Sequence, residues 1–578
     1  MTTVRDATYD VLRECGLRTL FANPGSTEVP LLAGMPDDLR FVLALHEGSV
    51  VGMATGHAIA TGLPALAILH TTAGLGNAVG ALATARVNRA PLVVLVGQQD
   101  RRHLALQPFL AGRRLDALAG EYPVWTDQPV LPQDVPSAIR RAWHEAATAR
   151  GPALVVVPMD DWSAEFDPAG GLGLAAPLVV RRAPAADAAT TAEVAKRLDA
   201  ARNPAVVVGA GADDPATWQA LMALVERLGC PVWQEAFGAR AGFPQDHPRF
   251  AGHLPAGRSR LRGVLEAYDV VLVVGAPAFR QYPYEPGPLV PAGVTVVVVS
   301  DDAAEVHHSA ADLGVVADPA LTCAHLAALV APRGTGAGVP SREPMGAGVP
   351  TREPMGAGVP TREPMGAGVA SREVPEAVPP ALPGDAHPGE RVGQPLLHAA
   401  HVFAALAQRL PSDVVLVEET PSTRPDLHRL LPARAPRGFV SAAMGGLGFA
   451  LPAATGLRMG DPTRPVVAVV GDGSAMYGIQ ALWSAAKYGC GVLFVILSNG
   501  GYAIMDRLAE RQGGRPPWPG FGGVDIHTLA GGLGCPARRI DDHDTMTKVL
   551  DEVVPTLATR PEPLLLDIRV VPEEHFDP

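Results

Sequence analysis

Lysine is almost absent from this chain of 578 residues, because Lys196, Lys487 and Lys548 are the only lysines among 47 basic side chains. Its scarcity beside abundant alanine, glycine and proline is typical of a GC-rich genome and carries no functional signal. The net charge is −12, and no run of Lys and Arg interrupts the acidic balance. We therefore expect no nucleic-acid partner, since nucleic-acid-binding surfaces concentrate basic side chains.

Cysteine is also scarce. The five cysteines are Cys15, Cys230, Cys323, Cys490 and Cys535. Their odd number and the lack of a CxxC pair fit a reducing compartment and predict no zinc site. No apolar run reaches the ~18 residues that a membrane helix needs, and no basic leader precedes an apolar stretch at the N-terminus. We expect a soluble, cytoplasmic protein of several domains, with no membrane partner.

Apolar runs alternate with helical segments along most of the chain. Examples are residues 64–69 (PALAIL), 91–96 (PLVVLV), 204–209 (PAVVVG), 269–275 (DVVLVVG) and 466–471 (VVAVVG). Several runs are apolar on both faces, as strands are when helices cover both sides of a parallel sheet. The pattern predicts an α/β protein built from doubly wound parallel-sheet domains.

A ten-residue repeat breaks this pattern. From Gly336 the chain reads GAGVPSREPM, then GAGVPTREPM twice, then GAGVASREV. Each unit has too little apolar bulk for a core and is shorter than the ~20 residues that solenoid units need. We predict a disordered linker over residues 334–392. Neutral expansion is favoured over a binding role, because the repeat carries no aromatic residue and no dense charge.

Two distant segments share a fainter pattern. Residues 64–98 and 465–499 each read as strand, short polar turn, helix and strand at nearly the same spacing, with helical periodicity after the turn. His70 lies in the turn of the first segment and Asp472 in that of the second. Chance similarity between doubly wound segments explains the pattern equally well on its own. Different chemistry at equivalent turns instead fits two halves of one site.

The turn in residues 466–478 (VVAVVGDGSAMYG) has the geometry of a phosphate site. A strand that turns directly into a helix presents the free N–H groups of the first helical turn, and Ser474 can add its hydroxyl. The next strand ends at Asn499, and consecutive parallel strands end at the same sheet edge. Asp472 and Asn499, with a backbone carbonyl at Gly501, are candidate Mg²⁺ ligands, because Mg²⁺ takes most of its oxygens from phosphate and water.

The GDG turn followed by this asparagine resembles the cofactor motif of thiamine-diphosphate-dependent enzymes. The segments that resemble benzoylformate decarboxylases include NPGSTEVP (23–30), LALHE (43–47), LHTTAG (69–74), GGLGFALPAA (445–454) and GDGSAMYGIQALW (471–483). The resemblance covers the chain outside the ten-residue repeat. It implies an N-terminal pyrimidine-binding domain (1–180), a middle domain (188–333) and a C-terminal diphosphate- and Mg²⁺-binding domain (393–578). It also implies a homodimer at least, usually a homotetramer, with active sites shared between subunits.

The resemblance assigns roles to single residues. Glu47 matches the carboxyl group beside N1′ of the aminopyrimidine, where it promotes the reactive tautomer of the cofactor; otherwise it is a charge at a helix N-terminus. Ser26 and His70 match residues that contact substrate, and Tyr282 stands where the family has a second catalytic histidine. The cofactor-binding positions are Glu47, Thr420, Ser422, Gly445, Leu447, Gly471, Gly473, Ser474 and Tyr502. A helix cap explains Thr420 and Ser422 equally well, and Leu447 is otherwise a core leucine. The metal positions are Asp472, Asn499 and Gly501.

The implied reaction is the thiamine-diphosphate- and Mg²⁺-dependent, non-oxidative decarboxylation of a benzoylformate-like 2-oxo acid to an aldehyde and CO₂. Tyrosine has an ordinary pKa of about 10, against about 6.5 for histidine. Tyr282 should therefore slow protonation and favour ligation to a second aldehyde. Ser441 and Leu508 align with two phenylalanines of the substrate pocket, and Ile504 replaces a smaller residue. The aromatic walls are thus partly lost.

Two other functions fit the sequence less well. A carboligase similar to acetolactate synthase would form 2-hydroxy ketones, and some of those enzymes carry a flavin in the middle domain. Residues 209–214 (GAGADD) are a poor dinucleotide fingerprint, because Asp214 takes the third glycine position. A non-catalytic cofactor-binding protein is opposed by the complete set of candidate catalytic and metal-binding residues.

Overall fold

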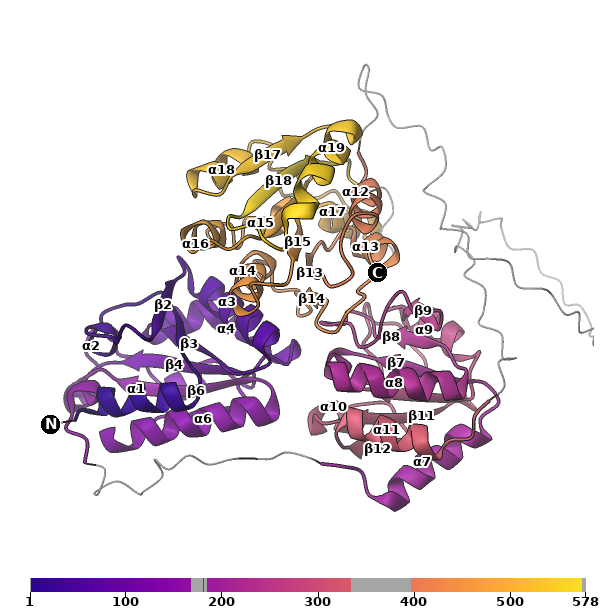
Figure 1. Ribbon diagram of the computed structural model, residues 1–578, viewed down its shortest axis with the longest axis horizontal. Coiled ribbons are helices and arrows are strands. Elements are labelled where there is room, and N and C mark those ends of the chain that lie inside the picture. The colour runs from indigo at the N-terminus through magenta and orange to yellow at the C-terminus, as the bar shows by residue number, and fades with distance from the viewer. Residues whose placement is uncertain (1, 168–179, 181–183, 334–396, 574–578) are drawn as a thin grey trace, which may run out of the picture.

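The chain forms three α/β domains that meet at a common centre. The computed structural model describes residues 2–167, 180, 184–333 and 397–573. Each domain has a six-stranded sheet in which all strand pairs are parallel. Figure 1 shows the C-terminal domain above and between the other two. The predicted fold class is confirmed. The predicted linker, residues 334–392, lies outside the described residues, and the domain boundaries stay predictions.

The N-terminal sheet has the strand order β2-β1-β3-β4-β6-β5. Its strands are β1 (Thr19–Ala22), β2 (Arg40–Leu43), β3 (Ala65–Leu69), β4 (Leu92–Gln98), β5 (Trp125–Asp127) and β6 (Pro152–Pro158). Its helices are α1 (Val4–Glu14), α2 (Val29–Leu32), α3 (Glu47–Thr61), α4 (Thr71–Val87), α5 (Leu115–Leu118) and α6 (Val135–Ala149). Strands β3, β4 and β6 are buried along their whole length, which explains their unbroken apolar sequence.

The middle sheet has the order β12-β11-β10-β7-β8-β9, so its strand order reverses between β7 and β10. Its strands are β7 (Pro204–Val208), β8 (Val232–Gln234), β9 (Phe250–His253), β10 (Val270–Val274), β11 (Thr295–Ser300) and β12 (Leu313–Val316). Its helices are α7 (Ala188–Ala200), α8 (Pro215–Leu228), α9 (Arg258–Leu265), α10 (Ala303–His307) and α11 (Pro319–Leu329).

Within the described ranges of all three domains, no helix has the length and apolar content needed to cross a membrane.

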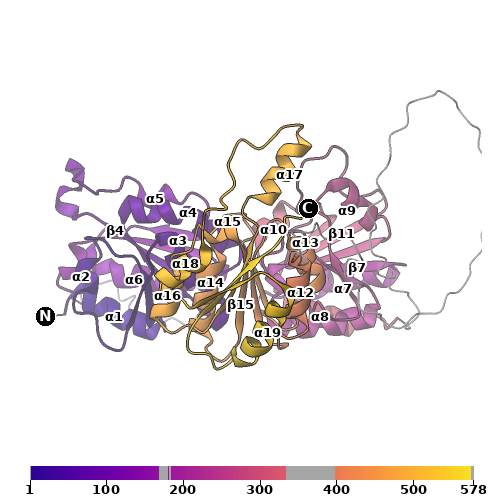
Figure 2. The ribbon, with the colours of Figure 1, turned by 90° about the horizontal axis from the view of Figure 1, so that it is seen from above.

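The C-terminal sheet, β14-β13-β15-β16-β18-β17, repeats the connectivity of the N-terminal sheet. Its strands are β13 (Val415–Glu419), β14 (Phe439–Ser441), β15 (Val466–Gly471), β16 (Leu493–Ser498), β17 (Ala537–Ile540) and β18 (Leu564–Arg569). Its helices are α12 (Ala399–Ala407), α13 (Arg424–Leu430), α14 (Ala450–Gly460), α15 (Asp472–Ala475), α16 (Ala481–Lys487), α17 (Ala503–Arg511), α18 (Ile526–Gly532) and α19 (His543–Val553). Figure 2 shows α17 standing out from this domain.

The two segments with similar sequence patterns take equivalent places, as β3-α4-β4 and as β15-α15-α16-β16. The expectation of one continuous helix is wrong for the second segment, where turns separate α15 from α16. Here the backbone lies against another loop, since a Cβ added to Gly478 would be 2.6 Å from the carbonyl oxygen of Gly448. This close approach holds the turn in place of a regular helix.

The N- and C-terminal domains pack through α3 and α14, which lie side by side in Figure 1. A side chain at Gly56 would overlap the backbone of Ala453, and one at Gly456 would overlap the backbone of Met53. The two helices therefore touch backbone to backbone. The hydrophobic core continues from one domain into the other across this contact.

A buried polar junction joins all three domains. The Nε of Arg240 donates to the Asp213 carboxylate at 2.7 Å, and the backbone N–H of Arg437 donates to the same carboxylate at 2.7 Å. The side-chain amide of Asn88 donates to the carbonyl of Ser441 at 3.0 Å. Asp213 and Arg240 come from the middle domain, Asn88 from the N-terminal domain, and the other two from the C-terminal domain. The junction thus fixes β14, from which the chain runs to Gly445.

Two stacked histidines lie between the middle and C-terminal domains. The rings of His253 and His428 are 3.8 Å apart and nearly parallel, at 11°. Burial, with the charge of Arg424, lowers the pKa of His428 to about 3, and burial lowers the pKa of His253 well below its ordinary value. Both rings are therefore neutral in the folded protein above pH 6.5.

This pair is expected to make the protein sensitive to acid. Below pH ~6.5 each histidine binds a proton in the unfolded chain but not in the folded one. Each of the two histidines therefore lowers the free energy of unfolding by about 1.4 kcal/mol for every pH unit that the pH drops. We expect His428→Phe to flatten this dependence between pH 6.5 and 4.5, as measured by urea unfolding. The exposed His103, replaced by Asn, is the control. Parallel curves for His428→Phe and the parent protein would contradict the assignment.

Candidate functional site

One half of the candidate site lies where β1, β2 and β3 end. These neighbouring strands are followed by the loop of residues 23–28, by Glu47 at the start of α3, and by His70 at the N-cap of α4. Parallel strands end at one edge, where α/β proteins bind ligands. Glu47 and His70 meet on either side of Gly74, since a Cβ added there would be 3.4 Å from Cγ of Glu47 and 3.3 Å from Cβ of His70.

The Glu47 side chain is held by two amides. The Nδ2 of Asn23 donates to Oε1 and the Nδ2 of Asn77 donates to Oε2, both at 3.0 Å. Glu47 is only 9% exposed. The two donors fix the plane of the carboxyl group, and each oxygen keeps a free lone pair for a further contact.

His70 is anchored through one ring nitrogen. Its Nδ1 lies 3.0 Å from Oε2 of Glu28 and 2.9 Å from the hydroxyl of Thr27. Thr27 in turn donates its proton to Glu28, so both oxygens at Nδ1 are acceptors and Nδ1 carries the proton. This arrangement leaves Nε2 of the neutral ring able to accept a proton. Ser26, in the same loop, is exposed.

The other half of the site is the turn at the end of β15. The carboxylate of Asp472 accepts the backbone N–H of Gly473 at 2.8 Å and that of Gly500 at 2.7 Å. The Asn499 side-chain oxygen accepts the N–H of Gly501 at 3.1 Å. The structure thus brings all three predicted metal-site residues together, although they come from two strand ends.

This turn fits a cation that carries a diphosphate. Burial raises the pKa of Asp472 despite its two N–H donors, and a cation would compensate the buried charge. Within the described residues, no group of three or more His, Cys, Asp and Glu side chains could hold a metal by itself. A Mg²⁺ ion here would need oxygens from phosphate and water, as Mg²⁺ sites usually do.

Gly473 in this turn lies close against two aromatic rings. A Cβ there would be 2.7 Å from the ring of Tyr502 and 3.0 Å from that of Phe521. These two rings pack edge to face, 4.9 Å apart. A hydrogen bond with Tyr477 and, second, burial raise the pKa of Tyr502. Gly471 begins this turn, and Ser474 follows in α15 with only 5% of its surface exposed.

The loop that contains Gly445 and Leu447 is held in place by the carboxyl group of Glu419. The Glu419 carboxyl group accepts the N–H of Gly448 at 2.5 Å and that of Ala450 at 2.7 Å, at the N-terminus of α14. Burial raises the pKa of Glu419 to about 8. Gly445 has a positive φ of 70°, a conformation that glycine adopts without strain. The loop lies against α4, the helix that carries Asn77.

Two further predicted residues lie in the loop after β13. The Thr420 hydroxyl donates to Glu418 at 3.0 Å and is thereby used inside the protein. The Ser422 hydroxyl accepts the N–H of Ile504 at 3.1 Å, so its own proton stays available for a ligand. Ser441, aligned with a pocket residue, is buried, and its hydroxyl donates to Glu418 at 2.7 Å. Leu508 lies with Ile504 on α17.

Tyr282 lies apart from these groups in the middle domain. It is 47% exposed and packs edge to face on Phe237 at 6.3 Å. No contact of the described residues joins it to Ser26, Glu47 or His70. Its predicted role stays a prediction.

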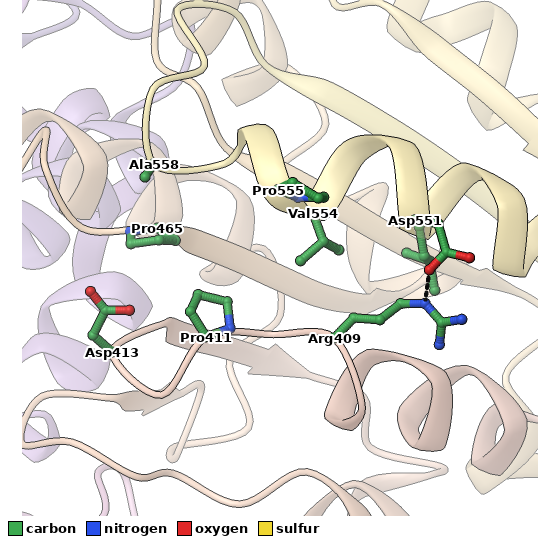
Figure 3. A pocket seen from close by; sticks show the side chains of 9 residues that line it. Arg409, Pro411, Asp413, Pro465, Asp551, Val554, Pro555 and Ala558 are labelled. Carbon is green, nitrogen blue, oxygen red and sulfur yellow. Dashed lines mark hydrogen bonds and ion pairs between the residues drawn. The ribbon is translucent and has the colours of Figure 1, made fainter.

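Figure 3 shows a surface pocket of about 340 Å³ beside α19 that is not the site. Asp413 and Pro465, which line it, precede β13 and β15, so the pocket lies at the opposite sheet edge from Asp472. Arg409 and Asp551 form an ion pair of 2.7 Å across it. Ligands of such sheets bind at the carboxyl edge of the strands, which this pocket does not reach.

Sequence reasoning missed Asn23, Glu28, Asn77 and Glu419. Glu28 stands two residues after Ser26 in a segment otherwise without charge, which was a usable signal. Glu419 lies at the end of a buried strand, where an acidic side chain needs hydrogen-bond donors to offset the cost of its burial. Nothing in the sequence singles out Asn23 or Asn77, because their roles depend on the position of Glu47.

Comparisons with known proteins agree with this geometry. Three family models match: the thiamine pyrophosphate enzyme N-terminal TPP binding domain over residues 2–116, the central domain over 191–326, and the C-terminal TPP binding domain over 422–568. Benzoylformate decarboxylase of Pseudomonas aeruginosa is 36% identical over 100% of both chains.

Two solved structures are also similar over nearly the full length. The thiamine diphosphate-dependent 4-hydroxybenzoylformate decarboxylase of Rhodococcus jostii RHA1 has a TM-score of 0.85 and 35% identity, covering 99% of this chain and 100% of its own. Benzoylformate decarboxylase of Polynucleobacter necessarius has a TM-score of 0.85 and 31% identity, covering 99% of both chains. With its three matching domains and these relatives, the chain belongs to the thiamine pyrophosphate enzyme family.

Proposed function

We propose that this protein is a thiamine-diphosphate- and Mg²⁺-dependent decarboxylase that converts a benzoylformate-like 2-oxo acid to an aldehyde and CO₂. The observation that carries the proposal is that the side chains of Glu47 and His70 both lie next to Gly74. The Glu47 carboxyl group is fixed by two amides, and the His70 ring is anchored through Nδ1. The similarity to benzoylformate and 4-hydroxybenzoylformate decarboxylases supports the substrate class.

The residues of the chain divide the work between binding and proton transfer. Bound thiamine diphosphate supplies the nucleophilic carbon and accepts the electrons released with CO₂. Asp472, Asn499 and the Gly501 carbonyl would hold Mg²⁺, and Ser422 and Ser474 would donate to the diphosphate. Leu447 and Gly445 would support the cofactor. We propose two copies of the chain at least, with each site shared between them.

Proton transfer falls to the N-terminal half of the site. Glu47, whose carboxyl plane is fixed by Asn23 and Asn77, would exchange a proton with N1′ of the bound aminopyrimidine. Ser26, exposed in its loop, donates to the substrate carboxylate. Nε2 of His70 accepts and returns a proton at the substrate's carbonyl oxygen, because Nδ1 is held by Glu28 and Thr27.

The middle domain argues against the flavin-containing carboligase. A dinucleotide would bind where the strand order reverses, at the ends of β7 and β10. There the N–H of Gly211 donates to the Gly275 carbonyl at 2.8 Å, and the buried Arg89 guanidinium packs on Gly211 while paired with Asp301. A flavin would have to displace a buried ion pair from this crevice. Ligation to a second aldehyde is the alternative outcome, because Tyr282 stands where the family has a catalytic histidine and tyrosine has the higher ordinary pKa.

The test offers purified protein with Mg²⁺ and thiamine diphosphate a panel of 2-oxo acids. Benzoylformate, 4-hydroxybenzoylformate, branched 2-oxo acids and pyruvate are supplied singly, and products are followed by proton NMR. We expect an aromatic aldehyde from one of the first two. A 2-hydroxy ketone as the main product would instead favour the carboligase, and no consumption of any acid would overturn the proposal.

Glu28→Gln is expected to lower kcat while leaving cofactor affinity unchanged. An amide offers only one acceptor oxygen, so the contacts from Nδ1 of His70, Gly25 and Thr27 can no longer all be made. A misoriented proton carrier costs about ten- to a hundredfold in rate. Steady-state kinetics and cofactor titration check this, with the surface variant Glu145→Gln as control. An unchanged kcat would show that Glu28 does not orient His70.

A further inference from the structure

The end of β2 is held by the C-terminal domain of the same chain. The phenol oxygen of Tyr488 accepts the backbone N–H of Leu43 at 2.7 Å, and the hydroxyl of Ser484 donates to the Leu43 carbonyl at 3.0 Å. Ser484 is fully buried in α16, and Tyr488 follows as the C-cap of that helix. The guanidinium of Arg40 lies 5.6 Å above the Tyr488 ring. Both backbone groups of one residue are thus bonded from another domain.

The topology explains why Leu43 needs these partners. Strand β2 is the edge strand of its sheet and pairs only with β1. The N–H groups of Arg40 and Ala44 are donated toward β1, to the carbonyl of Arg18 just before that strand and to that of Ala22 at its end, so the N–H and C=O of Leu43 point away from it. Unpaired backbone groups in a protein interior are costly. Ser484 and Tyr488, four residues apart on one helical face, take the place of a neighbouring strand, Ser484 as the donor to the Leu43 carbonyl and Tyr488 as the acceptor of the Leu43 N–H.

The position of Leu43 decides what this contact can control. Glu47 begins α3 four residues later, and α3 is itself fixed on α14 by the glycine contacts at Gly56 and Gly456. The short connection between Leu43 and Glu47 is therefore fastened to the C-terminal domain at both ends. Helix α16 belongs to the same β15-β16 unit as Asp472 and Asn499.

We propose that Tyr488 and Ser484 are positioning residues that hold Glu47 in register for proton transfer, across the boundary between the two domains. This inference rests on the proposed role of Glu47 at the cofactor. Neither residue touches the candidate ligand positions, so both act through the β2 end.

The test uses Tyr488→Phe in the full-length protein, which removes only the hydroxyl group. In the protein without cofactor, we expect faster backbone hydrogen–deuterium exchange in the peptide spanning residues 40–47. With thiamine diphosphate and Mg²⁺ bound, proton exchange at the cofactor C2 should slow by about ten- to a hundredfold, the effect of small misplacement. Cofactor affinity should stay within about twofold, because the metal turn is unchanged. Ser484→Ala should show the same pattern to a smaller extent.

Tyr268→Phe is the matched control. Its hydroxyl accepts the Trp233 indole N–H at 3.0 Å in the middle domain, so the variant loses a comparable part-buried hydrogen bond in another domain from Glu47. It should leave peptide 40–47 and the C2 exchange rate unchanged. A Tyr268→Phe variant that slows C2 exchange as much as Tyr488→Phe would overturn the proposal, because the loss would then be general.

A double variant separates positioning from other effects. If Tyr488 acts through Glu47, then Tyr488→Phe should not slow C2 exchange further in a Glu47→Gln background. The proposal would be contradicted if the two substitutions slowed C2 exchange additively, or if Tyr488→Phe alone left C2 exchange at the parent rate. Normal exchange in Glu47→Gln would remove the role of Glu47 and the positioning role with it. Fast C2 exchange without decarboxylation of any 2-oxo acid would overturn only the proposed function, since C2 exchange needs no substrate.

Discussion

Glu47→Gln is expected to reduce the rate of aldehyde formation by about 10²- to 10⁴-fold, the usual contribution of a positioned acid–base group. Glutamine keeps the size of the side chain but cannot exchange a proton. Its NH₂ group would also face the amide donor of either Asn23 or Asn77, so one of the two hydrogen bonds is lost. Steady-state kinetics with the best 2-oxo acid of the panel measures the effect.

Three readouts separate this loss from a folding defect. Cofactor binding and the thermal unfolding midpoint should remain near those of the parent protein. The Glu47 carboxyl group lies at the first residue of α3 and is not part of the hydrophobic core. The surface variant Glu145→Gln should keep full activity. A Glu47→Gln enzyme with more than a tenth of the parent rate would be incompatible with the assigned role.

Arg240→Ala is expected to destabilise the protein by about 3–5 kcal/mol, since removing one member of a buried ion pair leaves the other charge uncompensated. Asp213 is 3% exposed, and its pKa is already raised by burial against the pull of Arg240. Without Arg240 this pKa rises further. The folded variant then binds a proton that the unfolded chain releases, so the destabilisation is smaller at pH 5 than at pH 8. Urea unfolding at both pH values measures it.

The controls for Arg240→Ala compare exposed with buried pairs. Arg538 pairs with Glu552 on the surface, where the side chains are 41% and 61% exposed. Arg538→Ala should cost less than about 1 kcal/mol at either pH. Adding Asp213→Asn to Arg240→Ala should recover part of the stability, because the uncompensated carboxylate is then removed. Equal losses for the two arginines would show that the three-domain junction contributes no more than a surface pair.

Local patterns in the sequence were sufficient for the sheets and for half of the site. The runs that form β15 and β16 are apolar on both faces, and the rule that parallel strands end at one edge predicts that Asp472 and Asn499 lie close together. The resemblance supplied Glu47 and His70, and the structure then placed them on either side of Gly74.

Other parts of the site depend on contacts that no local pattern records. Glu28 reaches His70 only because Gly25 and Gly97 leave the space, where any Cβ would overlap the His70 ring or the Glu28 carboxyl group. The split between α15 and α16 follows from a loop that arrives from position 448. The clearest case is Leu43, whose partner Tyr488 is 445 residues away, beyond the reach of any periodicity.

That separation has a consequence for how the protein is made. Until Ser484 and Tyr488 have been synthesised, β2 is an open strand edge, and open edges pair with other chains. The ribosome adds roughly 5–20 residues per second, so the 445 intervening residues leave this edge open for roughly 20 to 90 seconds. The N-terminal domain therefore completes its fold only near the end of translation. We expect fragments that stop before α16 to aggregate in the cell more than the full-length chain, as measured by the soluble fraction of each.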